Sequence, residues 1–146
     1  MKKFNTTAVC VPQKHYMVDL SKRVEQIKRM VDEGEYFTIN RARQYGKTTT
    51  ITALRRRLAE DYSVVSLDFQ GISASGFRTE ENFVRDFARM VLKRRRTIRD
   101  IPEDAARVLE SLASQAQPEA GLSELFDCLT EWCAESPRPV VLIIDE

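Results

Sequence analysis

The chain has 146 residues, and its 23 Lys and Arg against 22 Asp and Glu give a formal net charge of +1. Because positive and negative residues are almost equal in number, the chain has no overall electrostatic field that would attract nucleic acid or a membrane. With 42% hydrophobic and 31% charged residues, the composition is typical of a folded globular protein and excludes a disordered tail.

The first seven residues, M-K-K-F-N-T-T, are too polar for the apolar part of a signal peptide, and no stretch reaches the length of a membrane span. We therefore expect a cytoplasmic protein without a membrane partner. The three cysteines lack CxxC spacing, so they indicate neither a disulfide framework nor a zinc site. We expect Cys10, Cys128 and Cys133 to be buried thiols.

The first predicted helix covers residues 20–33. Asp19 is suited to its N-cap, and Gly34 stands where a left-handed residue ends many helices. Its apolar residues recur on one face: Leu20, Val24, Ile27 and Val31. Residues 1–35 are therefore predicted to form an N-terminal segment with a leading helix.

Residues 36–40, Y-F-T-I-N, form a β-rich run that leads directly into R-A-R-Q-Y-G-K-T-T-T, residues 41–50. This order predicts a strand, a phosphate-binding loop and a helix, because N–H groups at a helix start bind phosphate oxygens. Gly46 lets the backbone approach phosphate closely, Lys47 places an ammonium beside the terminal phosphates, and Thr48 offers a hydroxyl to Mg²⁺.

The match to a P-loop is partial. The full pattern has a glycine five residues before Gly46, where this chain has Arg41. Residues 48–60 nevertheless carry a helical apolar stripe after the loop: Ile51, Leu54 and Leu58. The alternative is an ordinary strand-to-helix turn that contains a lysine.

Residues 63–69 predict a second strand, followed by a loop of small residues. Thr79 then caps a helix whose apolar stripe is Phe83, Phe87, Met90 and Val91. The helix ends in a basic run: Lys93, Arg94, Arg95, Arg96 and Arg99. Because no aromatic residues are interleaved, a solvated helix end is favoured over a contact with nucleic acid, which is therefore not indicated as a partner.

Two further helices are predicted before the last strand. The first of these helices begins after residues 100–102, and the second helix covers about residues 122–135. Its expected core face is Leu122, Leu125, Phe126, Leu129 and Trp132. We interpret Trp132 as a core residue rather than a stacking platform.

Residues 140–144, V-V-L-I-I, predict a parallel strand buried on both faces. Asp145 and Glu146 follow at its carboxyl end, where ligands bind in open α/β sheets. In a P-loop enzyme Asp145 would hold Mg²⁺ through water, and Glu146 would orient and deprotonate the attacking water. The alternative is a buried strand that ends in a solvated acidic turn.

The order of elements predicts the α/β class with a parallel sheet and helices on both faces, the three-layer α/β/α architecture of P-loop NTPases. Four segments resemble the bacterial AAA-like ATPases, which are similar to archaeal-type and signal-transduction ATPases. These segments are H-Y-M-V-D (15–19), Y-F-T-I-N-R-A-R-Q-Y-G-K-T-T-T (36–50), S-L-D-F-Q-G-I-S (66–73) and V-V-L-I-I-D-E (140–146). The resemblance covers nearly the whole chain, with 36–146 as the N-terminal part of the P-loop core from Walker A to Walker B.

The resemblance implies ATP and Mg²⁺ as cofactors. It makes Lys47 the phosphate lysine and Glu146 the catalytic base, with Thr48 and Asp145 as Mg²⁺ ligands. The residues that it implies for nucleotide binding are Arg43, Gln44, Tyr45, Gly46, Lys47, Thr48 and Thr49, with Tyr16, Met17 and Val18 beside adenine.

In such ATPases a further strand with a polar sensor residue lies between the P-loop strand and the Walker B strand. The chain stops before that strand, so we expect the N-terminal part of a longer hydrolase, incomplete at its C-terminus and inactive by itself. The expected function is Mg²⁺-dependent ATP binding, with hydrolysis in the intact protein. Alternatives are a nucleotide-dependent switch without turnover, a degenerate inactive fragment, or a small-molecule kinase, against which the Asp-Glu pair argues. The protein partner is not indicated, and oligomerisation of the longer protein stays open.

Overall fold

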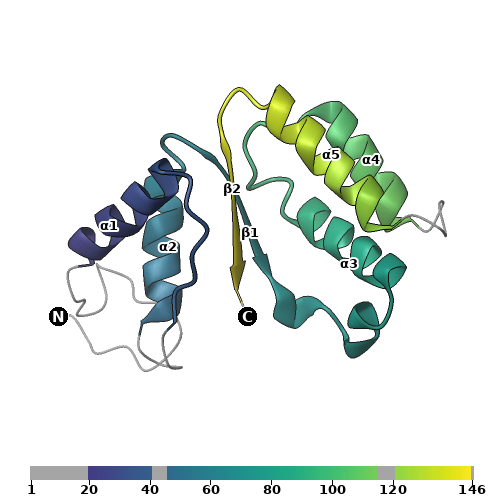
Figure 1. Ribbon diagram of the computed structural model, residues 1–146, viewed down its shortest axis with the longest axis horizontal. Helices are drawn as coiled ribbons and strands as arrows, with labels where there is room; N and C mark the ends of the chain where they lie inside the picture. The colour runs from purple at the N-terminus through teal and green to yellow at the C-terminus, as the bar shows by residue number, and fades with distance from the viewer. Residues whose placement is uncertain (1–19, 41–45, 115–120, 146) are drawn as a thin grey trace. The chain divides into compact units, whose positions relative to one another are not determined.

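The computed structural model describes residues 20–40, 46–114 and 121–145. They form five α-helices and a two-stranded parallel sheet, so the fold is mixed α/β (Figure 1). The chain divides into two compact units, Met1–Glu60 and Asp61–Glu146. Among the described residues, no helix combines the length and the apolar character needed to cross a lipid bilayer.

The first unit contains α1 (Ser21–Asp32) and α2 (Lys47–Leu58), which confirms both predicted helices. The predicted end of α1 is also correct: Gly34 has φ +72°. The Gly34 N–H donates to the Val31 carbonyl (2.9 Å) and the Glu35 N–H to the Met30 carbonyl (3.0 Å), so the last carbonyls are satisfied in a Schellman arrangement. The predicted N-cap, Asp19, lies outside the described residues.

The two helices of this unit contact each other. Their buried apolar residues are Val24 and Ile27 of α1 and Leu54 and Leu58 of α2. Arg57 Nε lies 2.7 Å from Glu25 Oε1, and Arg57 Nη1 lies 2.8 Å from Glu60 Oε2. These ion pairs are partly exposed, so we expect each to contribute no more than about 1 kcal/mol to the free energy of unfolding. Apolar burial therefore provides most of the stabilisation.

The predicted strand at residues 36–40 is wrong. Residues 35–40 have no regular secondary structure. Phe37 and Ile39 are partly buried while Tyr36, Thr38 and Asn40 are exposed, and this alternation is what resembled a strand. A strand also needs a neighbour for its ladder of hydrogen bonds, and the two strands in the described part of the chain pair with each other.

The sheet of the second unit pairs β1 (Ser63–Asp68) with β2 (Val140–Asp145). The strands are parallel, and their register runs from Ser63 beside Val140 to Asp68 beside Asp145. Both strands were predicted at these positions. Two short 3₁₀ turns, Phe69–Gly71 and Ala74–Phe77, follow β1.

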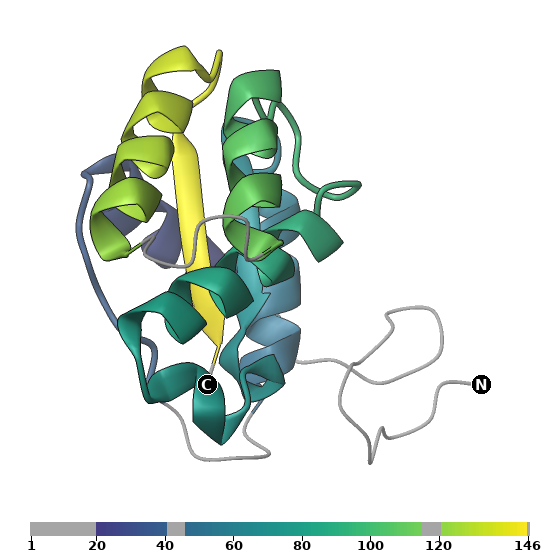
Figure 2. The same ribbon diagram turned by 90° about the vertical axis from the view of Figure 1, so that its right-hand side faces the viewer.

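Three helices lie together on one side of this sheet: α3 (Glu80–Lys93), α4 (Glu103–Ala113) and α5 (Leu122–Glu135) (Figures 1 and 2). Val65 and Leu67 of β1 join them in one core. The helical residues of this core are Val84, Phe87, Ala88, Val91, Ala105, Leu109, Leu112, Ala113, Leu125, Cys128 and Trp132. The prediction that Trp132 belongs to the core is confirmed.

Local hydrogen bonds explain why two of these helices begin where the sequence predicts. The Thr79 hydroxyl accepts a hydrogen bond from the Asn82 N–H (3.2 Å), which caps α3. The Gly121 N–H donates to Glu124 Oε2 (2.8 Å) at the start of α5, which is the glutamate half of a capping box. Both contacts use residues within one turn, and such features can be read from sequence.

The predicted burial of β2 and of Phe126 is wrong. No residue of β2 is buried, and Leu142 and Ile144 are 45% and 49% exposed. Phe126 was expected in the core of α5 and is 57% exposed. An aliphatic run shows that a segment can be buried, but burial also requires a neighbouring element to cover it. In the described residues those three side chains lack such cover.

We predict that Leu109→Ala lowers the free energy of unfolding by about 2–5 kcal/mol, because it leaves a cavity in the core of the second unit. Leu109 is fully buried, whereas its neighbour Val108 is 38% exposed. Val108→Ala is the matched control and should change the free energy by less than about 0.5 kcal/mol. Urea unfolding followed by the fluorescence of Trp132 measures both values. Equal effects would contradict this description of α4.

Candidate functional site

Five of the predicted site residues are described: Gly46, Lys47, Thr48, Thr49 and Asp145. The first four belong to the first unit and Asp145 to the second, so the two halves of the predicted site are described separately. The other predicted site residues lie outside the described part of the chain: Tyr16, Met17, Val18, Arg43, Gln44, Tyr45 and Glu146.

The first half of the site is the start of α2. Gly46 is the residue before the helix, with φ +77° and ψ +20° in the left-handed region, which a residue with a Cβ adopts only with strain. The first hydrogen bond of the helical ladder runs from the Thr50 N–H to the Gly46 carbonyl (2.9 Å). The N–H groups of Lys47, Thr48 and Thr49 precede that bond, and no side chain caps the helix.

The charges of α2 favour an anion at this end. Its first turn contains no acidic residue, and its last turn contains Arg55, Arg56 and Arg57. The helix dipole stabilises cations at the C-terminus of a helix. At the N-terminus its positive end attracts a negatively charged ligand. The start of α2 therefore carries the positive partial charge of a helix N-terminus with no acidic side chain in its first turn.

The threonines after Lys47 differ in exposure. Thr48 is exposed, and Thr49 is partly buried. The Thr52 hydroxyl donates a hydrogen bond to the backbone carbonyl of Thr48 (2.8 Å). The side-chain hydroxyl of Thr48 takes no part in this hydrogen bond. Thr50 is buried, and its hydroxyl has no hydrogen-bond partner among the described residues. Of these three threonines, Thr48 is the exposed one.

The second half of the site is the carboxyl end of the sheet. Asp145 is the last residue of β2 and is partly buried. Its register partner is Asp68, the exposed last residue of β1. Adjacent strands lie about 4.8 Å apart, so the ladder brings two carboxylates to one edge. Asp68 Oδ1 also accepts a hydrogen bond from the Gln70 N–H (2.9 Å).

Sequence reasoning missed Asp68 as a member of this edge. The signal was its position near the end of the strand predicted at residues 63–69, but the choice of neighbour for that strand was not visible in the local pattern. Carboxylate oxygens suit Mg²⁺, which is commonly bound through one or two carboxylates, water and phosphate oxygens. No group of three or more His, Cys, Asp or Glu within 20–40, 46–114 and 121–145 could hold a metal ion.

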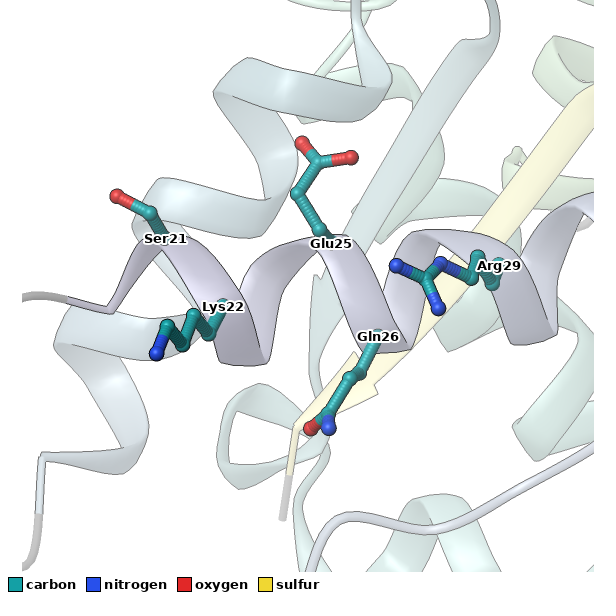
Figure 3. A pocket seen from close by; sticks show the side chains of 5 residues that line it. All are labelled: Ser21, Lys22, Glu25, Gln26 and Arg29. Carbon is teal, nitrogen blue, oxygen red and sulfur yellow. The ribbon is translucent and has the colours of Figure 1, made fainter.

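A surface hollow lies elsewhere, along α1 (Figure 3). Its lining consists of Ser21, Lys22, Glu25, Gln26 and Arg29. These side chains come from one helix and carry both signs of charge, and Glu25 is engaged by Arg57. None of them is a predicted site residue. The hollow is therefore not part of the predicted phosphate site.

The cysteines divide into two kinds. Cys128 is buried as predicted, with its Sγ 3.7 Å from the Ala105 carbonyl oxygen. Burial raises the pKa of the Cys128 thiol, and the nearby charge of Glu131 raises it further. Cys133 is exposed, so the prediction of a buried thiol is wrong there. Cys10 lies outside the described residues.

Comparisons with models of protein families, with curated proteins and with solved structures found no match for this chain.

We predict that iodoacetamide alkylates Cys133 at least about tenfold faster than Cys128 in the native protein at pH 8. The thiolate is the reactive form, and the raised pKa of Cys128 lowers its thiolate fraction at this pH. Mass spectrometry of the labelled peptides gives both rates. The same measurement in 8 M urea is the control, where the two rates should converge. Equal rates in the native protein would contradict the burial of Cys128.

Proposed function

We propose that this chain binds ATP together with Mg²⁺ as a P-loop NTPase, and that the intact protein hydrolyses ATP. The observation that carries the proposal is the left-handed Gly46 directly before a helix that begins at Lys47. The N–H groups of the first turn of a helix have no partners within the helix and can bind an anion, and Lys47 adds a cation at the same end. This local backbone supports the proposal that the G-K-T tripeptide binds phosphate.

The second unit supports the proposal independently. Its Walker B candidate, β2, is a strand of a parallel sheet and pairs with β1. Asp145 also ends its strand, at the edge of the sheet where α/β proteins bind ligands.

The proposed roles follow from the chemistry of each group. Lys47 and the N–H groups of the first turn of α2 bind the β- and γ-phosphates, and they stabilise the charge that develops during transfer. The Thr48 hydroxyl and the Asp145 carboxylate are the hard oxygen ligands suited to Mg²⁺, which neutralises phosphate charge when bound. Glu146 is proposed to orient the attacking water and accept its proton.

We predict that Lys47→Ala weakens ATP binding at least about tenfold, or about 1.4 kcal/mol, because it removes the ammonium next to the phosphates. Arg56→Ala is the matched control, since Arg56 is an exposed cation in the last turn of the same helix. It should change the affinity less than twofold. Titration of a fluorescent ATP analogue with Mg²⁺ measures both. Equal affinities for Lys47→Ala and the unaltered protein would exclude a phosphate site at α2.

A separate prediction concerns Asp145. Asp145→Asn should abolish most of the gain in affinity that Mg²⁺ gives, while binding in EDTA stays the same, because the amide is a poorer Mg²⁺ ligand than the carboxylate. The control is Asp127→Asn, which changes an exposed carboxylate on α5. The same titration with and without Mg²⁺ measures the difference. A full Mg²⁺ effect in Asp145→Asn would remove Asp145 from the metal site.

A further inference from the structure

The strongest unexplained charge on the described surface is the basic turn, which we define as residues 93–96, Lys-Arg-Arg-Arg. All four residues are exposed at the end of α3. Arg95 Nη1 lies 3.2 Å from Glu110 Oε1. Lys93, Arg94 and Arg96 have no acidic partner among the described residues. Three neighbouring cations are therefore available to an external anion.

Four other arginines of the second unit form ion pairs: Arg85, Arg89, Arg107 and Arg138. Arg138 Nε lies 3.0 Å from Asp100 Oδ2, and Arg107 contacts both Glu103 and Asp104 at 3.6 Å. Charge pairing is thus common in this unit, and the basic turn departs from it. The even charge of the whole chain conceals this local excess.

The basic turn is held in place by its backbone. The Arg94 carbonyl accepts hydrogen bonds from the Thr97 N–H (2.8 Å), the Thr97 hydroxyl (2.8 Å) and the Ile98 N–H (3.2 Å). Val91 and Ile98 on either side are buried in the core. The turn therefore presents its cations from a fixed base, so a partner does not have to order the backbone on binding.

We propose that the basic turn binds the phosphate backbone of duplex nucleic acid without reading its sequence. Guanidinium groups bind phosphate oxygens in pairs. Each strand of a duplex carries a charge about every 3.4 Å along the axis. A duplex therefore presents a continuous row of phosphates to the neighbouring cations of the basic turn.

The composition of the turn argues against the other polyanions. It presents no exposed apolar side chain that could enter a lipid bilayer. It also contains no aromatic ring on which a single-stranded base could stack. The sequence alone favoured a solvated helix end. The fixed backbone and the unpaired cations are the observations that change this interpretation.

The test is fluorescence anisotropy with a labelled 20-base-pair DNA duplex of mixed sequence, the full chain and no nucleotide, over a series of salt concentrations. The variant Lys93→Gln/Arg94→Gln/Arg96→Gln should bind at least about tenfold more weakly. Its slope of log affinity against log salt should fall in magnitude by about 3, because each phosphate contact contributes about 0.9. Trp132 fluorescence checks that the variant is folded.

The matched control is Lys22→Gln/Arg78→Gln/Arg107→Gln, which removes the same number of charges from exposed positions elsewhere. It should keep the affinity within about twofold. The proposal is overturned if the two variants behave alike, or if the unaltered protein does not bind the duplex at 50 mM salt. Tighter binding to a poly-glutamate peptide or to phosphatidylserine vesicles at the same salt would overturn it in favour of that partner.

Discussion

The parallel pairing of β1 with β2 determines the architecture of the second unit. A parallel pair cannot be closed by a hairpin, so the chain must cross back over the sheet, and residues 69–139 form that crossover. They place three helices on one side, where Val65 and Leu67 complete the core. Ser63 fixes the start of the ladder: its N–H donates to the Pro139 carbonyl (2.9 Å), and its hydroxyl donates to the Arg99 carbonyl.

The same ladder produces the acidic edge of the sheet. The register is continuous from its first pair to its last. Asp68 and Asp145, which end the two strands, are therefore neighbours although 76 residues lie between them in the sequence. The start of α2 is different in kind, since the backbone that we propose for phosphate binding depends on Gly46 and the adjacent turn alone. One half of the candidate site is therefore made by long-range pairing and the other by local backbone geometry.

This difference explains how much could be predicted from the sequence. The helix at 122–135 was predicted from its local apolar periodicity, and the left-handed Gly34 from its position just after a predicted helix. Phe126 was misplaced because it lies only about 100° around the helix from the buried Leu125, and periodicity does not show how wide the covered face is. The register partner Asp68 and the missing ladder at residues 36–40 depend on distant neighbours, which local patterns do not contain.

The basic turn raises the question of why its cations are tolerated. A helix C-terminus favours positive charge by about 0.3–1 kcal/mol per group, and this accounts for the presence of basic residues after α3. It does not account for the lack of acidic partners at Lys93, Arg94 and Arg96 among the described residues. Asp100 and Glu110 pair with Arg138 and Arg95, so these two nearby carboxylates are already engaged. Under the proposal, the phosphates of a duplex would supply the negative charge that these carboxylates do not.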